Sequence, residues 1–160
     1  MNVEDLVVKI SNILRQKNLK IATAESCTGG LIANIITNMS GSSDFFERGV
    51  VTYSNESKME LLDVPQDLLI KYGAVSKQVA KAMAKGIRKN SKVDIGISTT
   101  GIAGPAGATK TKPVGLVFIG ISTKDFTKAE KFTFSKNRIG NKEEACKSAL
   151  NQLYNYLESI

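Results

Sequence analysis

Apolar residues recur at intervals of three and four near the start of the chain, again after residue 76, and in the last twenty residues. This period of about 3.6 residues predicts amphipathic helices. The first covers residues 3–16 and carries on one face Val3, Leu6, Val7, Ile10, Ile13 and Leu14. The second begins at Ser76 and turns inward Val79, Ala80, Met83, Ala84 and Ile87. The third opens at Asn141 and turns inward Ala145, Cys146, Ala149, Leu150, Leu153 and Leu157.

Between these helices lie short apolar segments that have the character of strands. They cover residues 20–24, 48–53, 93–99 and 114–122, and the alternating segment 128–134 is expected to pair antiparallel with the last of them. Further helices are predicted at 28–39, capped by Thr28, at 54–62 and at 65–73, with a turn anchored by aromatic residues at 41–47. Helices and strands alternate first, and a hairpin follows. The pattern predicts an α/β fold, a three-layer α/β/α sandwich with a mixed sheet, formed by residues 1–160 as a single domain.

Composition narrows the class of protein. The chain has 160 residues, of which 42% are hydrophobic, and no apolar run approaches the length of a membrane span. The first residues contain acids and a helical period, unlike a signal peptide, so we expect a cytoplasmic protein with no membrane partner. Two cysteines give no disulfide framework.

The net charge of +7 comes mostly from scattered lysines. The densest stripe follows one helix face and consists of Lys77, Lys81, Lys85 and Arg88. No aromatic residues interleave with it and no nucleic-acid motif is present, which favours a solvated helix face. We therefore expect a small-molecule substrate, for which an anion would suit the charge, rather than nucleic acid.

The absence of histidine is the most restrictive feature of the composition. It excludes a Ser-His-Asp triad and a Cys-His pair within this chain. It also leaves too few ligands of the usual kind for a zinc site, so no metal is expected. Any nucleophile must be activated by another base, and lysine and tyrosine are the remaining candidates.

Three polar or glycine-rich turns follow predicted strands, where ligands bind in open α/β sheets. The turn at 25–30 exposes N–H groups of Thr28, Gly29 and Gly30 that could hold an anion. The turn at 54–58 brings Lys58 close to Tyr53, and a lysine among apolar or positive neighbours can act as a neutral base. The loop that begins with Thr100 and Gly101 is long and rich in glycine, which is typical of functional loops, and its N–H groups could face a substrate amide or an oxyanion.

Several side chains could be the nucleophile. Serines lie in two turns, Ser26 in the first and Ser42 and Ser43 in GSSDFF, and a serine near Lys58 could react as a Ser-Lys enzyme does. Cys27 is an alternative, in an amidase that would also use Glu25 and a lysine. Strand alternation places Cys27 and Ser26 on opposite faces, and a small buried residue is the simpler role for the cysteine.

Five co-linear motifs resemble those of one family: TAESCTGG at 23–30, GSSDFFERGVVTYSNESK at 41–58, GAVS at 73–76, TGIAGP at 100–105 and KPVG at 112–115. They are similar to the CinA C-terminal domain family, the nicotinamide-nucleotide amidases or NMN deamidases, in a stand-alone form. The resemblance implies hydrolysis of nicotinamide mononucleotide to nicotinate mononucleotide and ammonia, in pyridine nucleotide salvage. It also implies a three-layer α/β/α fold and no cofactor. We expect a homo-oligomer.

The resemblance also implies roles for individual residues. Ser43 would be the nucleophile, and Tyr53 and Lys58 its proton-transfer partners. Ser26 and Thr100 would position the amide or substrate, beside Gly101 and Gly104 of TGIAGP, and Arg138 would bind the substrate phosphate. The sequence departs from the family pattern around Arg138, where Asn137 replaces an aspartate and Lys142 is nearest to a second arginine, and in GPAGA.

A second class of function stays open. Proteins of this family are linked by name to competence and DNA damage, so a non-catalytic binding module is the alternative to an enzyme. The charge of +7 fits it weakly. The Ser, Tyr and Lys set favours the enzyme, because a scaffold needs no such constellation.

Overall fold

The computed structural model describes residues 1–160, which form six α-helices, one short 3₁₀ helix and five strands. In chain order these elements are α1 Val3–Lys17, β1 Ile21–Glu25, α2 Leu31–Thr37, η1 Ser42–Asp44, β2 Phe46–Val51, α3 Asn55–Leu62, α4 Gln66–Tyr72, α5 Lys77–Ser91, β3 Ile95–Gly101, β4 Leu116–Ser122, β5 Thr127–Thr133 and α6 Arg138–Glu158. None of these helices combines the length and the hydropathy that a membrane span requires.

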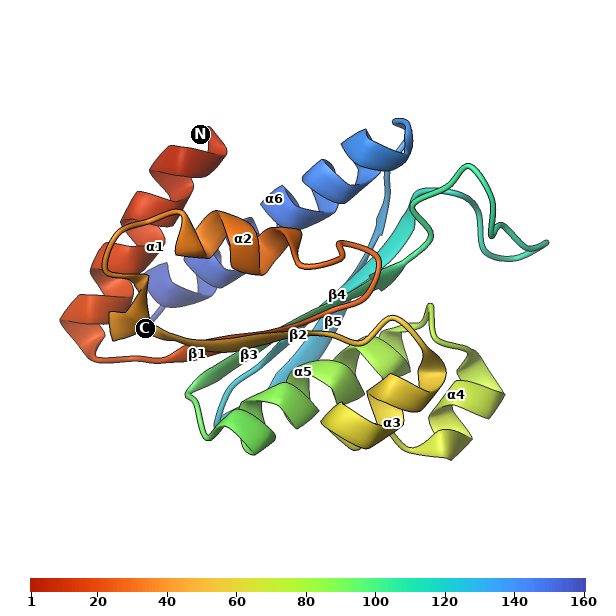
Figure 1. Ribbon diagram of the computed structural model, residues 1–160, viewed down its shortest axis with the longest axis horizontal. Coiled ribbons are helices and arrows are strands. Elements are labelled where there is room, and N and C mark those ends of the chain that lie inside the picture. Colours follow the sequence, from red (N-terminus) through yellow and green to blue (C-terminus); the bar gives the residue numbers. More distant parts are fainter.

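The five strands form one mixed sheet in the order β2-β1-β3-β4-β5. The strands β2, β1 and β3 run parallel, and β4 and β5 continue the sheet antiparallel. Helices α1, α2 and α6 cover one face, and α3, α4 and α5 cover the other (Figure 1). The predicted three-layer α/β/α fold with a mixed sheet is confirmed.

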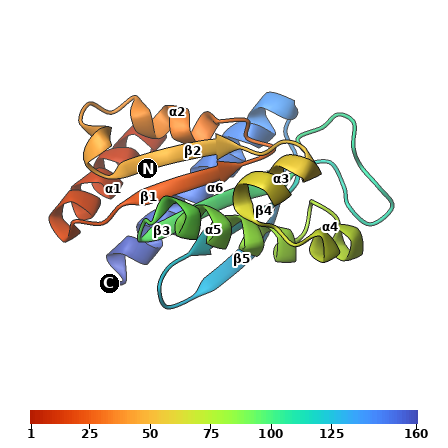
Figure 2. The ribbon, with the colours of Figure 1, turned by 60° about the horizontal axis from the view of Figure 1, so that its bottom comes forward.

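Each face of the sheet has its own apolar core. The larger core, under α1, α2 and α6, contains 20 buried residues, and the smaller, under α3, α4 and α5, contains 9. Every residue that the helical period turned inward on α5 is buried. A view turned toward this face shows α5 lying along the sheet with α3 and α4 at its side (Figure 2). A Cβ at Gly86 of α5 would overlap the carbonyl of Leu62, so glycine allows the two helices to pack this closely.

Two helix starts differ from prediction. The helix predicted to begin at Thr28 begins at Leu31, because Gly29 and Gly30 have left-handed φ angles of 62° and 98° and form a turn instead. The last helix begins at Arg138 rather than Asn141, since the side chain of Asn137 accepts a hydrogen bond from the N–H of Gly140 and caps it.

The topology decides which turns meet. Because β2, β1 and β3 are parallel, their carboxyl ends lie at one edge of the sheet. The segments that follow them begin at residues 52, 26 and 102. The loop between β3 and β4 extends from the same edge (Figure 1). The three turns predicted to carry chemistry are therefore neighbours.

Candidate active site

Ser26 and Lys58 form the centre of the candidate site. Lys58 Nζ lies 3.2 Å from Ser26 Oγ, within hydrogen-bond distance. Ser26 follows β1 directly and is 8% exposed, whereas Lys58 comes from the first turn of α3 and is 1% exposed. The side chain of Ser54 accepts from the N–H of Ser57, which caps α3 and fixes the turn from which Lys58 projects.

The surroundings of Lys58 are unusual for a lysine. Its Nζ donates to the main-chain oxygen of Thr52 at 2.7 Å, and the main-chain oxygens of Tyr53 and Ser54 lie farther from it, at 3.3 and 3.5 Å. No carboxylate forms an ion pair with it. Burial lowers the pKa of Lys58 below its usual value of 10.5. A buried amine that is oriented by carbonyls and has no counter-ion is suited to accept a proton from a nearby hydroxyl.

A pocket of about 160 Å³ opens above this pair. It is lined by Ser26, Cys27, Tyr53, Lys58, Ala74, Val75, Thr100, Gly101, Ala103 and Arg138. Thr100 is 1% exposed and donates its hydroxyl to the main-chain oxygen of Ala74 at 2.8 Å, which ties β3 to the segment before α5. The structure thus brings together five of the predicted site residues with Lys58: Ser26, Tyr53, Thr100, Gly101 and Arg138.

Tyr53 and Arg138 lie at the mouth of the pocket. Arg138 Nη2 donates to the Tyr53 hydroxyl at 3.2 Å, and Nη1 donates to the main-chain oxygen of Gly104 at 2.7 Å. The Tyr53 side chain is 64% exposed, and its hydroxyl has no hydrogen bond to Ser26 or Lys58. Only the main chain of Tyr53 contacts the lysine amine, so a proton-transfer role for its hydroxyl stays a prediction.

A second hollow adjoins the first. It has a volume of about 450 Å³ and is lined by Ala103, Gly104, Pro105, Val114, Lys136, Asn137, Arg138 and Ile139. Ala103 and Arg138 line both hollows. A ligand could therefore place a small group beside Ser26 and a larger one beyond Arg138.

The predicted anion turn differs from expectation in part. Thr28 is buried, and its hydroxyl lies 2.6 Å from Glu25 Oε1 and 2.8 Å from Thr99 Oγ1, so this hydroxyl is engaged within the protein. Gly29 is exposed at the surface of the turn. Lys142 Nζ lies only 3.5 Å from the position a Cβ would have on Gly29. The N–H of Gly29 donates to the main-chain oxygen of Ser26 at 3.1 Å, so this predicted anion-binding group is engaged within the turn, and the Thr28 hydroxyl has a structural role.

Ser43 lies at the opposite end of the sheet. Its turn precedes β2, whose first residue, Phe46, pairs with Ile21 at the start of β1, whereas Ser26 follows the last residue of β1. Five residues of strand separate the two ends by at least about 13 Å. Ser43 is also exposed. The prediction that Lys58 takes a proton from Ser43 is therefore wrong, because the parallel pairing carries the two serines to opposite edges.

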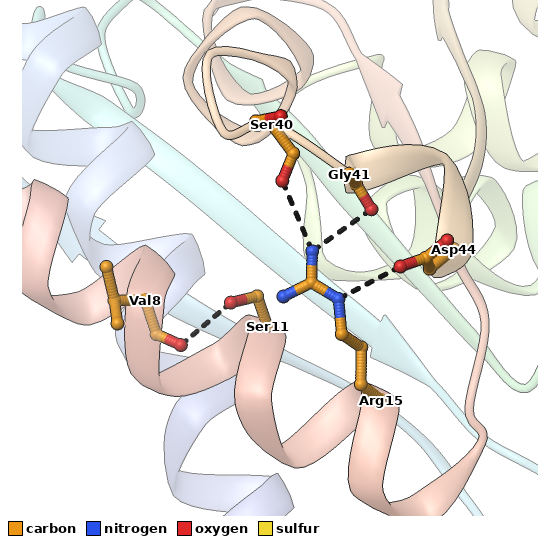
Figure 3. A network of polar contacts seen from close by, with 6 residues as sticks. All are labelled: Val8, Ser11, Arg15, Ser40, Gly41 and Asp44. Carbon is orange, nitrogen blue, oxygen red and sulfur yellow. Dashed lines mark hydrogen bonds and ion pairs between the residues drawn. The ribbon is translucent and has the colours of Figure 1, made fainter.

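The turn that carries Ser43 is held by an arginine of α1. Arg15 donates from Nε to Asp44 at 3.1 Å and from Nη2 to the main-chain oxygens of Ser40 and Gly41 at 3.3 and 3.1 Å (Figure 3). Its guanidinium also lies 5.2 Å from the centre of the buried Phe45 ring. The aromatic anchors predicted for residues 41–47 are thus present, and they serve packing.

Sequence reasoning missed three contributions to the site. It treated Glu25 only as a partner of a catalytic cysteine, although this carboxylate holds the turn that carries Ser26. It assigned no role to the main chain of residues 52–54, which orients Lys58. It compared Lys142 with a family arginine without placing it beside Gly29. Only the last had a usable signal, since Arg138 and Lys142 are four residues apart on one helix face.

Cys27 lines the pocket, but its burial disfavours a reaction at sulfur. Burial is the main cause that raises the pKa of the Cys27 thiol to about 12, so little of the thiolate needed for attack would form. No group of three or more His, Cys, Asp or Glu side chains is arranged to hold a metal ion.

The protein thus belongs to the class of α/β/α proteins that carry a buried Ser-Lys pair at the carboxyl edge of their parallel strands. Comparison with known proteins makes the assignment specific, because the CinA C-terminal domain model matches residues 3–157. This chain belongs to the CinA C-terminal domain family.

Relatives of known sequence agree with this assignment. A protein of Caldicellulosiruptor saccharolyticus named for competence-damage induction is 55% identical over 151 residues, which cover 94% of this chain and 36% of the relative. A "CinA-like protein" of Chloroherpeton thalassium is 49% identical over 146 residues, 89% of this chain and 35% of the relative. The chain thus spans about a third of the length of these curated relatives.

Solved structures match over the full length. The competence/damage inducible protein CihA of Agrobacterium tumefaciens is 36% identical with a TM-score of 0.93, covering 98% of this chain and 95% of that chain. A CinA superfamily protein of Klebsiella pneumoniae has a TM-score of 0.95 at 28% identity, covering 100% of both chains.

Proposed function

We propose that this protein is an amidohydrolase that converts nicotinamide mononucleotide to nicotinate mononucleotide and ammonia, with Ser26 as its nucleophile. One observation carries the proposal: the Lys58 amine, buried and without a counter-ion, lies 3.2 Å from Ser26 Oγ. A serine beside a lysine of lowered pKa is the arrangement of Ser-Lys acyl-transfer enzymes, and it needs no histidine. The substrate itself rests on the family resemblance.

The reaction begins with proton transfer from Ser26 to the neutral amine of Lys58. Ser26 Oγ then forms a bond to the carboxamide carbon, and the carbonyl electrons move onto oxygen. The N–H groups of Cys27 and Thr28 donate no main-chain hydrogen bond and follow Ser26 directly in the chain, so they are candidates to hold this oxyanion. As the C–N bond breaks, the Lys58 ammonium returns the proton to the leaving nitrogen, which departs as ammonia.

Water completes the cycle. Lys58, again neutral, accepts a proton from a water molecule that attacks the acyl carbon of the Ser26 ester. The ester C–O bond breaks and Ser26 regains its proton from Lys58. The acid product ionises, and the site returns to its starting state without a redox partner.

The two adjoining hollows fit a mononucleotide. The inner one, of about 160 Å³, admits a carboxamide group beside Ser26 but is too small for a whole nucleotide. The ribose and phosphate must therefore extend past the mouth, toward the outer hollow of about 450 Å³. Arg138 lines both hollows and supplies positive charge for a phosphate on that path, and Lys142 lies nearby beside Gly29.

The test is ammonia release from nicotinamide mononucleotide by the purified protein, with Ser26→Ala and Ser43→Ala as a matched pair. We expect the first variant to lose activity and the second to retain it. Loss in Ser43→Ala alone, or an inactive wild-type protein, would contradict the proposal. The Cys27 alternative is tested in the same assay, because Cys27→Ala should retain activity.

A binding module remains the second candidate, favoured by one observation. The lysines of the α5 stripe, Lys77, Lys81 and Lys85, are exposed and take part in no salt bridge. Salt-dependent binding to duplex DNA at physiological ionic strength, lost on reversing the charge of this stripe, would support it. The stripe lies on α5 and lines none of the pocket above Ser26.

A further inference from the structure

Glu25 is a buried carboxylate that the reaction described above does not use. It is the last residue of β1, it is 1% exposed, and no cation pairs with it. Its Oε1 accepts from the Thr28 hydroxyl at 2.6 Å and from the N–H of Ile32 at 3.0 Å, and its Oε2 accepts from the N–H of Ala33 at 3.0 Å. All three partners are donors, which suits an acceptor-only carboxylate at the start of α2.

These bonds determine which hydroxyl is the donor in the hydrogen bond between Thr28 and Thr99. The single proton of the Thr28 hydroxyl goes to Glu25, so in the 2.8 Å contact between the Thr28 and Thr99 hydroxyls Thr99 must be the donor. The main-chain oxygen of Thr99 accepts from the N–H of Ser26 at 3.0 Å. The turn from Glu25 to Thr28, with Ser26 inside it, is thus fastened to α2 on one side and to β3 on the other.

The main chain of Glu25 reaches the other half of the site. Its carbonyl oxygen accepts from the N–H of Thr52 at 2.8 Å, and the carbonyl of Thr52 accepts from Lys58 Nζ at 2.7 Å. One residue therefore connects the turn that carries the hydroxyl to the segment that orients the amine. We propose that Glu25 is the positioning residue that sets Ser26 Oγ against Lys58 Nζ, a role that rests on the proposed amidase function.

The carboxylate cannot be replaced without losing part of this arrangement. Glutamine keeps the length but offers a single acceptor oxygen, and its NH₂ group would face at least one of the three donors in either orientation. Aspartate keeps both oxygens but is one methylene shorter, by about 1.5 Å, so it cannot reach the donors of α2 from the same strand position. Both substitutions should displace Ser26 while leaving every lining group of the pocket in the chain.

The experiment compares Glu25→Gln with Ile36→Ala, a core truncation in α2, the helix whose N–H groups bind the carboxylate, that leaves Glu25 itself unchanged. The kinetic constants for ammonia release from nicotinamide mononucleotide are measured below the unfolding transition of each variant. We expect kcat of Glu25→Gln to fall on the order of 100-fold with KM changed less than about threefold, and kcat of Ile36→Ala to stay within about threefold. Should Glu25→Gln not fold, Thr28→Val tests the same hydrogen bond between Thr28 and Glu25, because it removes only the hydroxyl. Thr28→Ser keeps the hydroxyl and should restore kcat.

A second measurement separates this role from the function on which it rests. Labelling of Ser26 by a fluorophosphonate probe, followed by mass spectrometry, reports the reactivity of the hydroxyl without the substrate. Slower labelling in Glu25→Gln and Thr28→Val, with normal labelling in Ile36→Ala, supports the positioning role. A wild-type protein that labels and turns over, with Glu25→Gln and Thr28→Val equal to it, overturns that role alone. A wild-type protein that neither labels nor releases ammonia overturns both proposals.

Discussion

Two serine-bearing turns flank the first parallel strand pair, and their surroundings differ in every respect that matters for chemistry. The turn after β1 is buried, contains a carboxylate at its base, and presents Ser26 to an amine without a counter-ion. The turn before β2 is exposed, is held by Arg15, and presents Ser43 to solvent. Both are small, polar segments rich in hydroxyls in the sequence. The difference teaches that a serine becomes a candidate nucleophile through its neighbours.

The largest effect that should separate the two turns is on catalysis. Ser26→Ala removes the proposed nucleophile, so kcat for ammonia release should fall on the order of 10³-fold or more. Ser43→Ala should stay within about twofold of wild type, because its side chain contacts no part of the pocket. Steady-state kinetics of both variants measure the contrast, and equal losses would mean that the two turns do not differ as the geometry indicates.

The next effect concerns the base. Since burial lowers the pKa of Lys58, kcat/KM should rise as pH increases through that lowered value, with the inflection below 10.5. Lys58→Met should reduce kcat about 10²–10⁴-fold and abolish this limb. A pH profile in which wild-type kcat/KM does not rise with pH anywhere below 10.5 would count against a neutral lysine as the base.

The same pKa shift has a consequence for stability. Between the lowered pKa of the folded state and the usual value of 10.5, Lys58 binds fewer protons in the folded state than in the unfolded state. The contribution of this residue to the free energy of unfolding therefore increases with pH across that window. Lys58→Met should lack this dependence, which denaturant titrations at several pH values would reveal.

The fold was predictable from the sequence because its signals are local. The periods of α1 and α5, the caps Ser54 and Ser76 and the alternation of β5 each specify an element without reference to the rest of the chain. The mixed sheet followed from the order of the elements. The starts of α2 and α6 were the exceptions. Helix α2 begins late because two glycines have left-handed φ angles, and α6 begins early because the side chain of Asn137 caps it.

The site was predictable only in part, because its decisive facts are contacts between distant residues. The sequence indicated Lys58 as the base, since no histidine is present, and identified the three turns that meet at the sheet edge. It did not indicate which serine the lysine faces, because strand pairing sets that choice and the two serines are 17 positions apart in the numbering. The acceptor role of residues 52–54 involves the main chain, which side-chain identities do not reveal.

A smaller effect concerns Tyr53, which was expected to share proton transfer with Lys58. Its hydroxyl accepts from Arg138 at the mouth of the pocket instead of contacting the reacting pair. Tyr53→Phe should therefore raise KM about two- to fivefold with little change in kcat, through a less restrained Arg138. A loss of kcat near that of Lys58→Met would instead assign the tyrosine hydroxyl to proton transfer.

The smallest effect on chemistry should come from dismantling the exposed turn itself. Arg15→Ala removes one ion pair and two hydrogen bonds to carbonyl oxygens (Figure 3), and also the contact with the Phe45 ring. The ion pair is exposed and contributes little, so the loss should be about 1–2 kcal/mol of unfolding free energy, mostly from the carbonyl contacts and packing. Because these contacts lie at the far end of β1, kcat should stay within about twofold of wild type while the unfolding midpoint falls. Thermal unfolding and ammonia release measured on the same preparation test both halves of the expectation. A loss of kcat in Arg15→Ala without a change in the unfolding midpoint would show that the two ends of β1 are coupled. The exposed turn would then also contribute to catalysis.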